Sequence, residues 1–499
     1  MPIIYFGKLF TNMKLERKKF RLNLKKNAFP FQQDAFDIIK NQKYFAVFHE
    51  QGLGKTKIAI DLSYFWLENE IVDSVLIVTK KSLINNWIDE LEFHGNMPPI
   101  VFDSNKAKNF HKFSFPGYLY LTNYELIRDN KESFMRFIKH RKVGIILDES
   151  TQIKNPSSKT SKSLHYISSE CIRRIIMTGT PISNRPYDMW SQIFFLDLGE
   201  RLGESFEDFK ENYDLNNDLN NNPGGQIIFK NNLSLLNQKL SDCSLRETKK
   251  TAGLKLPGKS FIAKEIAMDN KQQILYKKIQ QELSAIVLKN GKFIEENVES
   301  VLKRLIRLVQ ISSNPALVDQ SYSNVPPKLK ATEEIVQNAV EQGSKVIIWT
   351  NFVENVDLIT NYFKEYGAVG ISGNVDNNLR NTYLSDFRNN ESIKLLIATP
   401  GVAREGLTLV EANHAIFFDR NFSLENYLQA QDRIYRISQK KECFIYKLLA
   451  INSIDYWVDS LLEAKEISAR YAQGDITKED YEAGMSFDFF EILKEILAN

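Results

Sequence analysis

One stretch constrains this chain more than any other: His49–Thr56, which reads HEQGLGKT. An apolar run, Tyr44–Phe48, comes before it and predicts a buried strand, and the apolar pattern after it predicts a helix. A glycine turn between a strand and a helix N-terminus favours anions, because free N–H groups and the helix dipole point to one place. The stretch therefore predicts a phosphate-binding loop, although His49 stands where the full pattern has its first glycine. An ordinary glycine-containing turn is the alternative.

Each residue of this loop has an expected task. The backbone of Gly52, Leu53 and Gly54 would bind nucleotide phosphates. Lys55 would reach the β- and γ-phosphates, and the hydroxyl of Thr56 would hold Mg²⁺.

A second apolar run, Val143–Leu147, ends in two carboxylates, Asp148 and Glu149. Such a pair most often only caps a helix, but a nucleotide hydrolase needs it downstream of a phosphate loop. Asp148 would orient Mg²⁺, and Glu149 would polarise the attacking water. The two features together predict an ATPase with ATP and Mg²⁺ at its site.

The hydrophobic pattern predicts two α/β units with parallel sheets. The expected strands are 44–49, 74–79, 117–122, 143–147 and 174–178 in the first unit, and 345–350, 368–372, 393–399, 414–419 and 444–449 in the second. Only the first unit carries a phosphate loop. This asymmetry predicts that ATP sits between two lobes and that the second lobe completes the site.

Arginines supply the candidate for that completion. Arg433 and Arg436 are spaced i, i+3, so on a helix they would face the same way. A guanidinium aimed at the γ-phosphate would stabilise charge that develops during phosphoryl transfer. Two solvated arginines on an amphipathic helix are the alternative.

These motifs resemble, in order, those of superfamily-two helicase-type ATPases of the Swi/Snf group, over residues 28–460. The resemblance rests on Pro30–Gln32, Glu50–Thr56, Leu76–Trp87, Leu121–Glu125, Asp148–Asn155, Met177–Asn184, Trp349–Phe352, Gly373, Thr399–Leu409 and Gln429–Gln439. It implies two tandem RecA-like lobes, and it adds two nucleotide contacts, Gln32 and Gly406. It also implies coupling residues, which are Thr178, Gly179, Thr180 and Gln429. Ser150-Thr151 replaces the Ala-His of the group, which is expected to alter the coupling of hydrolysis to movement.

The expected divisions are a basic extension at 1–28, a first lobe at 29–250 with an Asn-rich, turn-like insertion at 212–232, and a helical protrusion with linker at 251–325. A second lobe at 326–460 and a helical brace at 461–499 follow. The net charge is only +3, so a nucleic-acid surface must be local. The basic face of residues 14–21 is either solvated or a DNA contact.

Three distant cysteines form no disulfide framework, which predicts a reducing, intracellular setting: the cytoplasm of a bacterium or an infected host cell, or the nucleus in a eukaryote. No apolar run is long enough to span a membrane.

The resemblance implies an ATP-driven translocase on duplex or branched DNA that remodels forks or junctions or displaces bound protein. Its compact form is similar to viral or bacterial members. A strand-separating DNA or RNA helicase is one alternative, and a nucleotide-dependent DNA-binding scaffold without turnover is the other. The intact Lys55, Asp148 and Glu149 argue against the scaffold.

Overall fold

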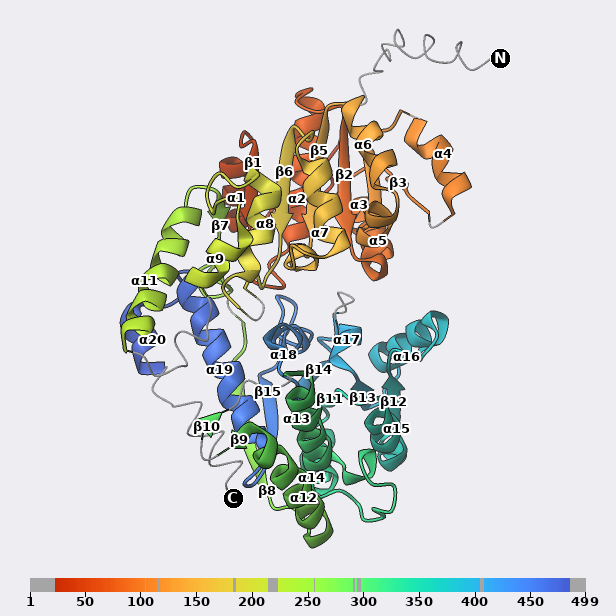
Figure 1. Cartoon of the computed structure of the whole chain (residues 1–499). Coiled ribbons are helices and arrows are strands. Elements are labelled where there is room, and N and C mark those ends of the chain that lie inside the picture. The colour runs from red at the N-terminus through yellow and green to blue at the C-terminus, as the bar shows by residue number, and fades with distance from the viewer. Residues whose placement is uncertain are drawn as a thin grey trace, which may run out of the picture.

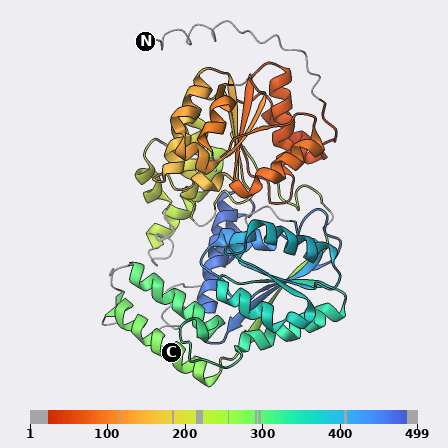
Figure 2. The same cartoon turned by 90° about the vertical axis from the view of Figure 1, so that its right-hand side faces the viewer.

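The computed structural model describes residues 23–103, 105–114, 116–182, 185–213, 223–254, 256–289, 292–293, 298–403 and 408–484. Within these ranges the chain forms two lobes, one above the other, and each lobe is built on a parallel sheet (Figure 1). A quarter turn of the molecule shows the strands of each sheet between helices (Figure 2).

The first lobe holds a seven-stranded sheet in the order β3-β4-β2-β5-β6-β1-β7. Its strands are β1 (Tyr44–Val47), β2 (Ser74–Thr79), β3 (Ile100–Val101), β4 (Leu119–Asn123), β5 (Val143–Asp148), β6 (Arg173–Met177) and β7 (Ser244–Leu245). Its main helices are α1 (Pro30–Ile39), α2 (Lys55–Glu68), α3 (Ile84–His94), α4 (Lys106–Ser114), α5 (Tyr124–Asp129), α6 (Lys131–Lys139), α7 (Lys159–Ser168), α8 (Asp188–Asp197) and α9 (Phe206–Asn212).

Both faces of this sheet are buried, which explains why its strands read as continuous apolar runs. Phe45 and Val47 of β1 pack in one cluster of buried side chains, whereas Ala46 packs in the cluster on the other face. The same alternation places Val75 on the first face and Leu76 on the second. Side chains that alternate along each strand therefore fill two cores, one under each helical layer.

The second lobe holds a six-stranded sheet in the order β12-β13-β11-β14-β15-β8. Its strands are β8 (Lys259–Ile266), β11 (Lys345–Trp349), β12 (Ala368–Ile371), β13 (Leu395–Ala398), β14 (Ala412–Phe417) and β15 (Cys443–Ala450). Its helices include α14 (Pro327–Glu341), α15 (Val353–Tyr362), α16 (Asn377–Asn389), α17 (Pro400–Ala403) and α18 (Leu424–Gln431). Every strand predicted from the sequence is present in one of the two sheets, with small shifts at its ends.

One strand of the second sheet, β8, lies well before the predicted start of the second lobe at residue 326. β8 pairs in parallel with β15 along its whole length, from Lys259 opposite Cys443 to Ile266 opposite Ala450. It is an edge strand whose residues are mostly exposed or half-exposed, so it lacks the apolar run of a central strand. Two helices, α12 (Asn270–Val287) and α13 (Val298–Ser313), then protrude before the sheet resumes (Figure 2).

The turn-like insertion predicted at 212–232 is wrong from residue 223 on, where helix α11 (Pro223–Leu240) begins. Leu233, Leu236 and Leu240 of this helix are buried, and their spacing of three and four residues lines one helical face. Packing of that face outweighs the asparagine-rich composition that favours turns. Residues 214–222 of the prediction lie outside the described ranges.

The C-terminal part joins the two lobes. Helix α19 (Ile454–Ala472) packs against β15 of the second lobe and against α11 of the first, and α20 (Lys478–Gly484) packs on α19 (Figure 1). The remainder of the predicted brace, 485–499, and residues 1–22 of the basic extension lie outside the described ranges. In the part of the chain that the structure describes, no helix is both long and apolar enough to cross a membrane.

Candidate nucleotide site between the lobes

The phosphate-loop prediction falls at the end of β1 and the start of α2. Gly52 has φ +86° and Gly54 has φ +68°, both in the left-handed region that residues with a Cβ rarely adopt. Gly54 is the N-cap of α2, so Lys55 opens the helix and the first N–H groups of α2 point out of the turn. The loop thus has the backbone conformation that an anion site requires.

Lys55 closes the loop from within. Its Nζ donates to the carbonyl oxygens of His49, at 2.9 Å, and of Glu50, at 3.4 Å. Desolvation lowers the pKa of Lys55, and the nearby charges of Glu149 and Asp148 act in the opposite direction. The ammonium group therefore lies at the loop and within electrostatic reach of both predicted catalytic carboxylates.

Asp148 ends β5, and the structure fixes one of its oxygens. Oδ2 accepts hydrogen bonds from Trp87 Nε1, at 2.8 Å, and from Thr79 Oγ1, at 3.0 Å. Burial and the neighbouring Glu149 raise the pKa of Asp148. Oδ1 has no hydrogen-bond partner among the described residues, so one carboxylate oxygen is held and the other is available to a cation.

Glu149 turns the chain out of the sheet. Its φ of 55° and ψ of 56° are left-handed, which is uncommon for a residue other than glycine and is found often at functional sites. Its Oε2 lies 3.5 Å from Thr178 Oγ1, and that hydroxyl accepts from Thr180 N at 3.2 Å. The predicted water-positioning carboxylate and the predicted coupling segment are therefore in contact.

Gly179 of the coupling segment packs directly on the phosphate loop. A Cβ at this position would lie 2.5 Å from Gln51 Cγ and 3.3 Å from Lys55 Nζ. No larger residue fits there unless the loop moves, so this glycine is required by close approach. Loop, carboxylates and coupling segment form one continuous site.

The sequence suggested that Arg433 and Arg436 lie on a helix. This expectation is wrong, because α18 ends at Gln431. They lie in the turn that follows, and each side chain caps that turn. Arg433 Nε donates to the carbonyl of Gln429 at 3.0 Å, and Arg436 Nε donates to that of Asp432 at 2.8 Å. We call residues 432–436 the arginine segment.

Both arginines nevertheless reach the first lobe. Arg433 Nη2 is 3.4 Å from Gln51 Oε1, and Arg436 Cγ lies 3.5 Å from where a Cβ on Gly52 would be. Burial and the adjacent Arg436 lower the pKa of Arg433 to about 9, and the Glu149 charge opposes that shift. The structure thus brings the arginine segment onto the phosphate loop.

Gln32, expected to read adenine, is placed beside the loop. Its Oε1 accepts from Phe29 N at 3.0 Å, and its Nε2 donates to the Leu53 carbonyl at 3.0 Å and contacts that of Gly54 at 3.4 Å. In this arrangement its amide supports the loop, so adenine contact stays a prediction. Gly406, the other predicted nucleotide contact, lies outside the described residues.

Gln429 of α18 is buried and takes part in a second connection between the lobes. Its Nε2 donates to Glu425 Oε1 at 3.2 Å, and Glu425 Oε2 accepts from Lys154 Nζ at 3.1 Å. Lys154 follows the Asp-Glu pair in the first lobe. The carbonyl of Gln429 also accepts from Arg433, so this residue lies between the arginine segment and the Glu425–Lys154 contact, and its coupling role stays a prediction.

The departure at Ser150-Thr151 changes internal contacts. Ser150 Oγ donates to Gln192 Oε1 at 2.7 Å, and Gln192 Nε2 donates to the Pro181 carbonyl at 2.8 Å. Thr151 Oγ1 is buried without a hydrogen-bond partner in the described part of the chain. A hydroxyl–amide relay therefore connects the carboxylate motif to the coupling segment.

Several residues of the site were missed from the sequence. The partners of Asp148 required the fold, because Thr79 and Trp87 come from a different strand and helix. Lys249 lies in the segment between the sheets and forms ion pairs with Glu50 and Asp432. Nothing in the local sequence distinguishes this lysine from its neighbour Lys250.

Comparison with known families agrees with this geometry. The SNF2-related domain family matches residues 41–317, and the helicase conserved C-terminal domain matches residues 327–438. This chain belongs to the SNF2-related family. The predicted Swi/Snf group and the predicted fold of two RecA-like α/β lobes are confirmed, and the protein is a helicase-like ATPase of superfamily two.

Relatives in the SNF2 family come from yeast, bacteria and vertebrates. The ISWI chromatin-remodeling complex ATPase ISW1 of Saccharomyces cerevisiae is 25% identical over 430 residues, which is 81% of this chain and 36% of the yeast protein. An uncharacterized ATP-dependent helicase of Mycoplasma pneumoniae is 26% identical over 81% of this chain and 38% of its own length. The DNA repair and recombination protein RAD54-like of Danio rerio is 24% identical over 81% and 60%, respectively. This SNF2 chain therefore spans only a part of each of these relatives.

Among solved structures, the Sulfolobus solfataricus SWI2/SNF2 ATPase core in complex with dsDNA matches with a TM-score of 0.42 and 25% identity. The match covers 95% of this chain and 97% of that one.

Proposed function

We propose that this SNF2-family ATPase is a DNA translocase, which couples ATP hydrolysis between its lobes to movement along duplex or branched DNA. One observation carries the proposal: Arg433 of the second lobe contacts Gln51 in the phosphate loop of the first. A site assembled from two lobes is sensitive to their relative position. Hydrolysis at such a site can therefore drive a change in how the lobes sit on a polymer.

The first lobe would bind the nucleotide. Backbone N–H groups from Gly52 to Thr56 would cradle the phosphates, and Lys55 would exchange its bonds to loop carbonyls for bonds to phosphate oxygens. Because the ammonium already sits inside the loop, this exchange needs little movement.

The residues present fit Mg²⁺. The available Oδ1 of Asp148 and the hydroxyl of Thr56 are hard oxygen ligands, which this ion prefers, and Mg²⁺ in such sites takes its other ligands from phosphates and water. When bound, Mg²⁺ supplies positive charge to the transferring phosphoryl group.

Glu149 would orient the attacking water and accept its proton. Its left-handed backbone aims the carboxylate out of the strand end, and the contact with Thr178 fixes one of its oxygens. The second oxygen can then face the water. Any shift of Thr178 would move this carboxylate, which links the coupling segment to catalysis.

The second lobe would supply charge at the far side of the γ-phosphate. The Arg433 guanidinium contacts Gln51 of the phosphate loop, whereas the Arg436 side chain packs beside Gly52 and its Nη1 donates to Thr408 Oγ1 of its own lobe at 2.7 Å. Arg436 would therefore exchange that bond for a phosphate oxygen. Contacts that strengthen as charge develops lower the barrier without tightening ground-state binding. Product release would weaken the interaction between lobes and allow them to separate.

We infer that the polymer is DNA from the relatives of this chain, since their names refer to chromatin remodeling and to DNA repair and recombination. Backbone contacts would make binding insensitive to sequence and sensitive to salt. Measurement of ATPase rate with duplex, junction, single-stranded DNA and RNA side by side tests this. We expect duplex or junction DNA to stimulate the rate severalfold and added salt to abolish the stimulation. Equal stimulation by RNA would favour a strand-separating helicase.

A further inference from the structure

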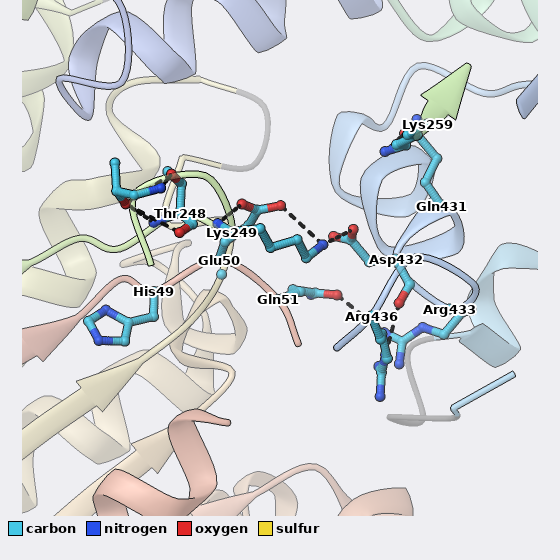
Figure 3. A network of polar contacts seen from close by, with 12 residues as sticks. His49, Glu50, Gln51, Thr248, Lys249, Lys259, Gln431, Asp432, Arg433 and Arg436 are labelled. Atoms are coloured by element: carbon cyan, nitrogen blue, oxygen red, sulfur yellow. Dashed lines mark hydrogen bonds and ion pairs between the residues drawn. The ribbon is translucent and has the colours of Figure 1, made fainter. Parts of the chain in front are cut away.

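A chain of three charges crosses from the first lobe to the second beside the nucleotide site (Figure 3). Lys249 Nζ lies 3.1 Å from Glu50 Oε1 and 2.8 Å from Asp432 Oδ1. Glu50 belongs to the phosphate loop, Asp432 opens the arginine segment, and Lys249 comes from the stretch that connects the two sheets. We call Glu50, Lys249 and Asp432 the interlobe bridge.

Lys249 is fixed to the phosphate loop by its backbone as well as its side chain. The parallel pairing of β1 with β7 continues past both strands, where Phe48 N donates to Leu245 O and Glu50 N donates to Glu247 O, each at 2.8 Å. The amide of Lys249 then donates to Glu50 Oε2 at 2.8 Å. Both oxygens of Glu50 therefore hold one residue, and Lys249 cannot shift without the loop.

The bridge is buried and charged. Lys249 is 5% exposed and Asp432 is 8% exposed. The pKa of Lys249 is raised, because the charges of Asp432 and Glu50 outweigh the effect of burial. The pKa of Asp432 is lowered, because the charges of Lys249 and Lys259 outweigh the effect of burial there. Both shifts keep the pair ionised, so the contact persists throughout the neutral pH range.

The position of Asp432 links the interlobe bridge to the two arginines. Asp432 directly precedes Arg433, and its carbonyl accepts from Arg436 Nε at 2.8 Å. On the other side, Glu50 directly precedes Gln51, the residue that Arg433 contacts. Two contacts one residue apart thus set the register of the arginine segment on the phosphate loop.

An ion pair between the first lobe and the C-terminal part lacks this connection. Arg246 Nη2 lies 2.7 Å from Asp475 Oδ2, which follows α19 and is remote in sequence from the arginines. It does not touch the arginine segment. Arg246 Nη1 also donates to the carbonyl oxygens of Phe48 and Gly179 in its own lobe, and these contacts do not involve Asp475. The Arg246–Asp475 pair can therefore serve as a control for the interlobe bridge, because it is an ion pair that does not hold the arginine segment.

We propose that Lys249 is a positioning residue for ATP hydrolysis, which holds the arginine segment in register with the phosphate loop. It contacts neither nucleotide nor DNA in this role, and the inference rests on the proposed function of Arg433 and Arg436. Lobe opening breaks its contact with Asp432 while its contacts with Glu50, in its own lobe, remain. The bridge therefore closes and opens with the site.

The test compares steady-state ATPase constants of Lys249→Met with those of two matched controls. Lys250→Met removes the same charge from the exposed neighbour, and Asp475→Asn breaks the other ion pair. We expect Lys249→Met to lower kcat at least tenfold with less than a threefold change in KM for ATP, and Lys249→Arg to recover part of the rate. Both controls should keep kcat within twofold of wild type.

A double-mutant comparison makes the test independent of general damage. Asp432→Asn should also lower kcat, and the double variant Lys249→Met/Asp432→Asn should be no slower than the slower single variant. If Lys249→Met does not fold, Asp432→Asn measured against Asp475→Asn decides the same question. Additive losses, or an equal loss in Asp475→Asn, would overturn the positioning role.

Arg433→Ala measured in parallel separates this inference from the proposed function. An Arg433→Ala variant with wild-type turnover would refute the arginine contribution and the bridge together. A slow Arg433→Ala variant beside an unimpaired Lys249→Met variant would refute the bridge alone.

Discussion

The two lobes share one architecture but use their strand ends differently. In each, a buried strand runs into a polar turn and a helix: β1 into α2, and β11 into α15. In the first lobe the turn holds left-handed Gly52 and Gly54, and its polar groups face the neighbouring lobe. In the first lobe, the turn at the end of the strand therefore takes part in the site between the lobes.

In the second lobe the corresponding polar groups bind one another. Asp419 is buried and accepts from Thr350 Oγ1 through Oδ2, and from Asn351 N at 2.7 Å and Asn351 Nδ2 at 2.8 Å through Oδ1. Asn355 Nδ2 adds a contact at 3.3 Å. The polar groups at these strand ends bind one another, and the arginine segment of this lobe reaches the shared site. A binding lobe and a completing lobe can therefore arise from one fold through the chemistry of a single turn.

The largest expected effect lies in the binding lobe. Lys55→Ala should weaken nucleotide binding and abolish turnover, because the ammonium group sits inside the phosphate loop. Glu149→Gln should keep nucleotide binding but slow turnover by a factor on the order of 10² or more, since it removes the proton acceptor. Fluorescent-nucleotide titration and ATPase assays measure the two quantities. Near wild-type turnover in Glu149→Gln would disprove its role.

The next effect lies in the completing lobe. Arg433→Ala should lower kcat by roughly 10²-fold with little change in nucleotide affinity, because the contact matters most in the transition state. Arg470→Ala, which removes an exposed arginine from α19, is the control and should leave kcat unchanged. A large loss of affinity without a loss of kcat would mean that the second lobe also binds ground-state nucleotide.

The internal network of the second lobe should affect stability and spare binding. Asp419→Ala leaves buried donors without an acceptor and should reduce the free energy of unfolding by about 1–3 kcal/mol. Urea unfolding measures this, with the exposed Glu365→Ala as control. Nucleotide affinity of the folded variant should be unchanged; a lower affinity would contradict the division of tasks between the lobes.

The smallest effect concerns the relay in the carboxylate motif. Ser150→Ala removes one buried hydrogen bond to Gln192 and should cost about 1 kcal/mol of stability. Because Gln192 also holds Pro181, DNA-stimulated ATPase should fall more than basal ATPase. Ser169→Ala, an exposed hydroxyl, is the control. Equal changes in both rates would show that the relay is structural and does not serve coupling.

The sequence was sufficient for the features that follow from periodicity and local motif. Apolar runs predicted the strands, and the loop pattern placed the turn at Gly54 after β1, with Lys55 at the start of the next helix. β8 was missed because an exposed edge strand has no apolar run, and α11 because its leucine stripe lies among asparagines. Contacts between distant segments, such as Trp87 with Asp148 or Lys249 with Asp432, depend on the fold and leave no local trace.

We propose that a site shared between two unlike lobes drives movement on intact duplex DNA. Displacement of a triplex-forming third strand from a duplex tests it most directly, with wild type and Arg433→Ala compared at equal protein and ATP concentrations. We expect ATP-dependent displacement by wild type and almost none by Arg433→Ala, although that variant should still bind nucleotide and DNA. ATP hydrolysis by wild type on the same duplex without displacement of the third strand would contradict the claim.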